Sequence, residues 1–154
     1  MAVDIRTKQI VSMKVTKEDV SDCRMLKPLV QQVVASSIIT INKVIADGAY
    51  DSNNNFRYLD QIGIEPVIKV RKNSSTEDTN GCMARKLVVL EQLRNTKLWK
   101  KKHGYGMRWI AESVFSSIKR TFGEHVASVK WNNIVNELLL KASIYNAFIS
   151  NVST

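Results

Sequence analysis

The chain of 154 residues has only two cysteines, Cys23 and Cys82, which lie far apart and in no metal-ligand spacing. Its two histidines, His103 and His125, have no cysteine or second histidine near them, which excludes a zinc module. No stretch approaches the roughly 20 apolar residues of a membrane span. Residues 1–7 show no apolar run followed by a cleavage site, as a signal peptide would. We therefore expect a reduced, cytoplasmic protein with no membrane partner.

Positive charge is abundant, and it is concentrated in one segment. Residues 94–130 hold nine basic and two acidic residues, so this segment carries +7 of the chain's net charge of +9. A concentrated basic field attracts polyanions, nucleic acid first and anionic membrane second. The alternative is a basic surface that only faces solvent. The hydrophobic share of 44% is that of a globular domain with a core.

Apolar periodicity and turn residues predict strands first and helices later. We expect short strands at 2–3 and 10–15, a helix from Asp22 to about Ala35, a buried strand at 44–46, a helix at 53–62 between Ser52 and Gly63, a strand at 66–70, a polar loop at 73–81, and helices at about 84–99, 106–122 and 132–150. This order predicts an α/β fold, with a mixed sheet flanked by helices and an all-helical carboxy-terminal part.

The most informative stretch is YGMRWIAESVFSSIK, which begins at Tyr105. At about 100° per residue, four polar residues of this stretch fall within an arc of roughly 60° on one helix; they are Tyr105, Arg108, Glu112 and Lys119. The apolar residues on the opposite side would pack on a core; they are Ile110, Val114 and Ile118. One carboxylate is thus flanked by two cations and a phenol. The alternative is an exposed charged face with a simple Arg108–Glu112 pair.

A second candidate is Asp47, which directly follows the apolar run at 44–46 and precedes Gly48. Ligands and chemistry collect at the carboxyl ends of strands in sheets with helical crossovers. The alternative is an Asp–Gly turn that merely ends the strand.

Together these residues resemble those of DDE-type insertion-sequence transposases. The spacing Tyr105-x2-Arg108-x3-Glu112-x6-Lys119 matches the Y-R-E-K signature of that family, and Asp47 in ADGAYDS resembles its second catalytic aspartate. The resemblance covers residues 2–148.

The resemblance implies an RNase H-like catalytic domain over residues 1–154, with an insertion or linker at 73–100. It implies that Asp47 and Glu112 hold Mg²⁺ for cleavage and transfer of DNA strands. Tyr105, Arg108 and Lys119 would then bind the DNA backbone at the transposon ends. The expected assembly is a homodimer or a complex with an intact transposase.

The chain departs from the family pattern at its start. The first catalytic aspartate of the family lies on a strand upstream of Ala2, so we expect a truncated form that is inactive or incomplete. Asp4 is expected to serve a turn instead. A non-catalytic, DNA-binding or dimerising fragment that regulates transposition is the alternative function.

Overall fold

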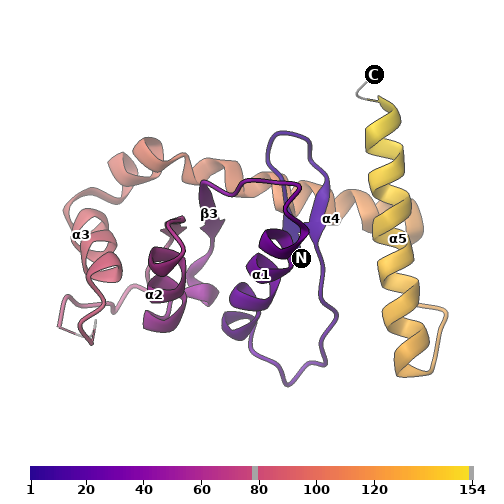
Figure 1. The fold of residues 1–154 in the computed structure, drawn as a ribbon, viewed down its shortest axis with the longest axis horizontal. Helices are drawn as coiled ribbons and strands as arrows, with labels where there is room; N and C mark the ends of the chain where they lie inside the picture. Colours follow the sequence, from indigo (N-terminus) through magenta and orange to yellow (C-terminus); the bar gives the residue numbers. More distant parts are fainter. Residues whose placement is uncertain (78–79, 153–154) are drawn as a thin grey trace. The chain divides into compact units, whose positions relative to one another are not determined.

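The computed structural model describes residues 1–77 and 80–152, and the chain divides into two compact units (Figure 1). Unit 1 consists of Met1–Lys17 and Trp109–Thr154, and unit 2 consists of Glu18–Arg108. The elements in chain order are β1 (Ala2–Val3), β2 (Ile10–Ser12), η1 (Asp22–Met25), α1 (Leu26–Ser36), β3 (Lys43–Ala46), η2 (Gly48–Tyr50), α2 (Asn53–Gln61), β4 (Glu65–Ile68), α3 (Met83–His103), η3 (Tyr105–Arg108), α4 (Trp109–Phe122) and α5 (Trp131–Val152), where η denotes a 3-10 helix.

The α/β class that we expected from the sequence is confirmed, but the strands form two small sheets. β1 and β2 pair antiparallel in unit 1, whereas β3 and β4 pair parallel in unit 2. The expectation of one mixed sheet is wrong for the described residues. The physical reason is that β1 and β2 join through a local turn, whereas α2 forms the crossover between β3 and β4.

Asp4 organises the turn between β1 and β2. Its Oδ1 accepts a hydrogen bond from the Arg6 amide at 2.9 Å, and its Oδ2 accepts one from the Thr7 hydroxyl at 3.1 Å. Lys8, which closes the turn, has a φ of 60°. The predicted turn role of Asp4 is confirmed, because these are the side-chain bonds that aspartate makes to nearby residues in turns.

Unit 1 is held together by apolar packing of α4 and α5 on the short antiparallel pair. The buried residues of this cluster are Ile10, Ile110, Val114, Ala142 and Tyr145. Ile118 packs against it partly buried, so the predicted apolar face of α4 is confirmed. On α5, Ala142 and Tyr145 are buried, whereas Phe148 is exposed.

In unit 2, the parallel pair runs in register from Lys43↔Glu65 to Ala46↔Ile68. Figure 1 shows α1 and α2 beside β3. Their apolar side chains form the main core with β4, and its fully buried members include Phe56, Leu59 and Ile68. Helix α2 begins as the sequence predicts, because the Ser52 hydroxyl accepts a hydrogen bond from the Asn55 amide at 3.2 Å.

Helix α3 is longer than predicted and contains a kink at Asn95, which has φ −160° and ψ 93°. The Asn95 side chain accepts a hydrogen bond from the Leu98 amide at 2.9 Å, so it caps the second half of the helix. His103 then ties this half to the strand pair. Its Nδ1 lies 2.6 Å from Glu65, and its Nε2 lies 2.9 Å from Glu91, which precedes the kink. The second half of α3 therefore has a fixed position within unit 2.

The predicted polar loop at 73–81 contains residues 78–79, which lie outside the described residues. Residues 73–77 and 80–81 of this loop form neither helix nor strand. None of the helices over 1–77 and 80–152 is long and apolar enough to span a bilayer.

Candidate functional site

Asp47 lies at the carboxyl end of β3 and begins the turn that follows. Its Oδ1 accepts a hydrogen bond from the Ala49 amide at 2.9 Å and so caps η2. Its Oδ2 lies 4.0 Å from Nη1 of Arg108, and 47% of its side chain is exposed. Asp47 thus shapes the turn, as one of its two sequence-based interpretations predicts, and its Oδ2 still faces a cation and solvent. Its role as a site residue stays a prediction.

Arg108 reaches Asp47 from η3, where Tyr105 is the first residue. Gly104 ends α3 with a φ of 68°, and a single 3-10 turn follows before α4 starts at Trp109. Tyr105 is buried, and its ring centroid lies 5.2 Å from that of Trp99. The expectation that four polar residues project from one face of one helix is wrong at Tyr105 and Arg108. Both lie in η3, a 3-10 turn with three residues per turn that forms a separate element.

Glu112 and Lys119 lie on α4 in unit 1. Their spacing of seven residues places them on the same helix face, as the sequence predicts. Glu112 is exposed. The ammonium of Lys119 lies 3.3 Å from the carboxylate of Glu124, past the end of the helix, and 5.0 Å from the ring centroid of Phe115. The structure thus brings Asp47 and Arg108 together in unit 2 and presents Glu112 and Lys119 from unit 1.

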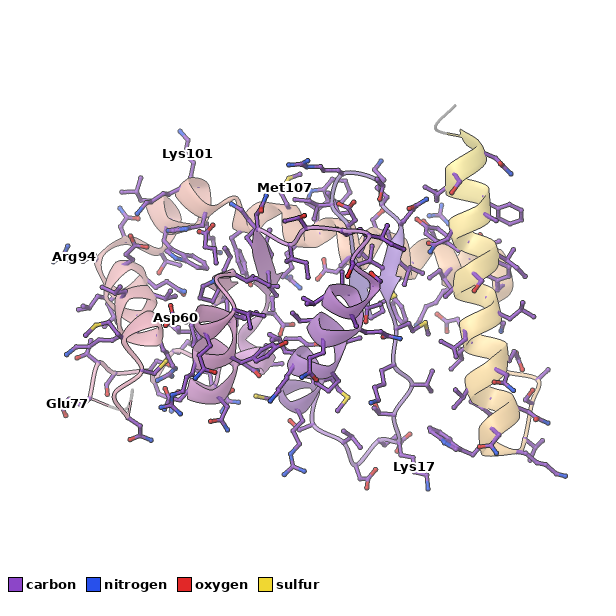
Figure 2. The ribbon with its side chains drawn as sticks, in the orientation of Figure 1. Lys17, Asp60, Glu77, Arg94, Lys101 and Met107 are labelled. Atoms are coloured by element: carbon purple, nitrogen blue, oxygen red, sulfur yellow. The ribbon has the colours of Figure 1, made fainter. Side chains whose placement is uncertain are left out.

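The second half of α3 carries much of the predicted basic charge on exposed side chains. Figure 2 shows Arg94 and Lys101 extending away from the α3 ribbon. Their exposed basic neighbours are Lys97, Lys100 and Lys102. Of these, Lys102 forms an ion pair of 2.6 Å with Glu91. The others present a positive surface of unit 2 that suits a polyanion.

Behind Asp47, a buried polar network fixes the chain. The Asp51 side chain is fully buried, and its Oδ1 accepts a 2.8 Å bond from Nε of Arg85, whose side chain is 9% exposed. Burial alone would raise the pKa of Asp51, but the bonds from Arg85, the Arg71 amide and Ser74 lower this pKa below its ordinary value. The turn that starts at Asp47 thus ends at Asp51, an ionised carboxylate that Arg85 holds in place.

The donor type at Asp47 fits Mg²⁺, because carboxylate oxygens are the ligands that this hard cation prefers. Over residues 1–77 and 80–152, no three His, Cys, Asp or Glu side chains form a group that could hold a metal ion. Asp47 offers one ligand of suitable chemistry.

The three tryptophans divide between core and surface. Trp99 is 2% exposed and packs in the core of unit 2. Trp109 is 55% exposed and Trp131 is 39% exposed. The ring of Trp109, which directly follows Arg108, is therefore accessible for stacking.

The basic residues after β4 were not predicted from the sequence as site residues. Lys69, Arg71 and Lys72 are exposed and lie at the same strand ends as Asp47, because the Lys69 amide donates to the Ala46 carbonyl at 3.2 Å. The available signal was three cations within four residues directly after a predicted strand.

Comparison with known proteins gives one match. A family model described as "Transposase DDE domain" matches residues 1–147, which is nearly the whole chain. Neither the curated proteins nor the solved structures contain a match.

Proposed function

The chain belongs to the transposase DDE domain family, and from this premise we propose that it acts in DNA transposition by cleaving and joining phosphodiester bonds at transposon ends. We assign it to the Y-R-E-K group of insertion-sequence transposases, with an RNase H-like arrangement. The observation that carries the proposal is the partly exposed Asp47 carboxylate at a strand end, 4.0 Å from Arg108.

In this proposal, Asp47 and Glu112 are ligands of Mg²⁺. Both are carboxylates, both have solvent access, and both lie within the matched residues. Bound Mg²⁺ would supply activation of the attacking oxygen and stabilisation of the leaving oxygen. The hydrogen bond from the Ala49 amide keeps Asp47 Oδ1 in a defined orientation, so that the carboxylate is positioned before any ligand arrives.

Arg108 and Lys119 are the proposed contacts to the DNA backbone. The guanidinium of Arg108 can bind a phosphate with two parallel hydrogen bonds, whereas Lys119 acts as a point charge. Tyr105 serves DNA binding indirectly in this proposal. Its ring packs on Trp99 and thereby holds η3, the element that carries Arg108.

The test is cleavage of transposon-end DNA by the Asp47→Asn variant in Mg²⁺. This change removes the charge of the carboxylate and keeps its shape, so cleavage should fall at least 100-fold, in keeping with loss of a metal ligand. DNA binding should change little. Asp60→Asn is the matched control, because Asp60 is an exposed aspartate of α2 in the same unit. Equal cleavage by the two variants would exclude Asp47 from the site.

A second candidate function is a non-catalytic, DNA-binding or dimerising module that regulates transposition. The exposed cations on the second half of α3 favour it, because they require no metal. It predicts that DNA binding weakens steeply with salt and is indifferent to Mg²⁺ and to Asp47→Asn. The wild-type chain would then bind transposon ends without cleaving them, and light scattering would show a homodimer or a complex with an intact transposase.

A further inference from the structure

Three cations after β4 lie beside Asp47 and have no role in the site as described so far. We call Lys69, Arg71 and Lys72 the basic rim. The amide of Lys69 bonds to the carbonyl of Ala46, the residue before Asp47. A Cβ built on Gly48 would lie 3.4 Å from the Lys69 carbonyl oxygen, so the two backbones approach closely here. The basic rim and Asp47 therefore occupy one end of the same strand pair.

Two buried side chains hold the backbone of the basic rim in place by hydrogen bonds. Gln92 of α3 accepts a hydrogen bond from the Val70 amide at 3.2 Å and donates one to the Ile68 carbonyl at 2.9 Å. Asp51 accepts a hydrogen bond from the Arg71 amide at 2.9 Å. Asp51 and Gln92 thus supply this segment with the backbone hydrogen bonds that a neighbouring strand would supply to a longer β4.

Ser74 and Arg85 complete the lock. The Ser74 hydroxyl donates to Asp51 Oδ2 at 3.1 Å and accepts from Nη2 of Arg85 at 3.1 Å. The Ser74 amide also bonds to the Arg71 carbonyl at 3.0 Å. Transfer of an ion pair such as Asp51–Arg85 out of water has a large desolvation free energy. Apolar residues could therefore support this loop at a smaller cost in free energy. What the polar pair adds is a single defined backbone path.

The side chains of the basic rim remain available to a ligand. All three are exposed, and none forms an ion pair with a carboxylate over residues 1–77 and 80–152. Asp51, the nearest buried carboxylate, is occupied by Arg85 and by the backbone. Three cations in four residues repel one another, and a polyanion relieves that repulsion.

We propose that the basic rim is a second DNA-backbone site, which binds phosphates flanking the one contacted by Arg108 beside Asp47, and that Asp51, Arg85 and Gln92 are its positioning residues. The proposal rests on the proposed function for its choice of DNA as the polyanion. A rigid row of cations at fixed spacing suits the regular phosphates of a duplex, because no loop has to be ordered when the ligand binds. An RNA duplex and an acidic protein are the other occupants, and the test separates them.

The experiment measures the affinity of the full chain for transposon-end duplex DNA between 50 and 200 mM salt. The triple variant Lys69→Gln, Arg71→Gln and Lys72→Gln is compared with a control that loses the same charge from exposed lysines elsewhere, namely Lys14→Gln, Lys27→Gln and Lys86→Gln. Loss of three phosphate contacts should reduce the slope of log affinity against log salt by about 2.7. Over this salt range the wild type should therefore lose roughly 40-fold more affinity than the rim variant. The control should change the slope by less than about 1.

Gln92→Leu tests the positioning role without changing charge. Binding should weaken roughly 3- to 10-fold with an unchanged salt slope, because the unlocked loop must then be ordered on binding. Unchanged affinity would exclude Gln92 as a positioning residue. Circular dichroism checks that each variant is folded.

Equal slopes for the rim variant and the control would overturn the proposal, and so would a rim effect confined to duplex RNA or to an acidic peptide. Failure of the proposed function is distinguishable from both results. If the wild-type chain binds transposon ends but cleaves none of them in Mg²⁺, the proposed function fails while the slope result for the basic rim stands. If the wild-type chain binds no DNA at 50 mM salt, both proposals fail.

Discussion

The two units of the chain are stabilised in different ways. Of the five buried polar or charged residues within 1–77 and 80–151, only Ser12 belongs to unit 1. The other four belong to unit 2; they are Asp51, Asn55, Arg85 and Gln92. Unit 1 relies on an apolar cluster between α4, α5 and the β1–β2 pair. Within it, the Asn146 amide bonds to both backbone groups of Ile10 at 2.8 Å.

The difference in buried polar side chains follows from the kind of backbone that carries the candidate site residues in each unit. Unit 2 holds irregular chain at the strand ends beside Asp47, and irregular buried backbone needs side-chain partners for its amides and carbonyls. Unit 1 presents Glu112 and Lys119 from a helix, whose backbone bonds are satisfied internally. Apolar packing of the opposite helix face is then sufficient to position them.

The largest expected effect on stability is in unit 2, which holds most of the buried polar residues described above. Arg85→Met removes one partner of the buried ion pair and leaves the Asp51 carboxylate uncompensated. We expect a loss of about 3–5 kcal/mol in the free energy of unfolding, measured by urea denaturation. The double variant with Asp51→Leu should recover part of this loss. A loss below about 1 kcal/mol would show that the pair is not essential to unit 2.

The matching test of unit 1 is Ile110→Ala, which removes a buried side chain from its apolar cluster. The expected loss is about 2–4 kcal/mol, from lost burial and the cavity that remains. Leu87→Ala is the control, because Leu87 is 56% exposed on α3 and should cost little. If the two variants had equal stability, the apolar account of unit 1 would be wrong.

A smaller effect is expected at the polar contact of unit 1. Asn146→Leu leaves the amide and carbonyl of Ile10 without their side-chain partner and should cost about 1–3 kcal/mol. Asn146→Asp keeps the acceptor for the Ile10 amide but sets a carboxylate oxygen against the Ile10 carbonyl, so it should also destabilise unit 1. Hydrogen exchange of the Ile10 amide reports the change directly, and unaltered protection in Asn146→Leu would contradict the assignment.

The smallest expected effect is the change with pH in the stability that Asp51 contributes to unit 2. The folded pKa of Asp51 lies below its ordinary value of 3.8, because its hydrogen bonds outweigh burial. The carboxylate therefore stabilises the fold above pH 3.8, and this contribution is lost as the pH falls through the folded pKa. Urea denaturation of the wild type and of Arg85→Met between pH 3 and 7 should show their stability difference narrowing toward acid. A constant difference would remove Asp51 as the cause.

Much of the local structure could be predicted from sequence because it depends on nearby residues. The Ser52 cap, the turn at Asp4 and the apolar face of α4 follow from hydrogen bonds and periodicity within a few residues. The end of the helix carrying Arg108 was mispredicted. Gly104 could mark a boundary, but burial of Tyr105 against Trp99 is a tertiary contact that periodicity does not contain.

The sequence by itself determined the α/β class, the approximate extents of most helices and the concentration of positive charge, because local periodicity and composition encode these properties. The tertiary structure decided which distant residues meet. It paired Asp47 with Arg108 across 61 residues of sequence, buried Asp51 against Arg85, and placed Lys69 beside Ala46. Such contacts depend on strand pairing and on the path of the chain between elements, and these are set by the balance of packing over a whole unit rather than by any short segment.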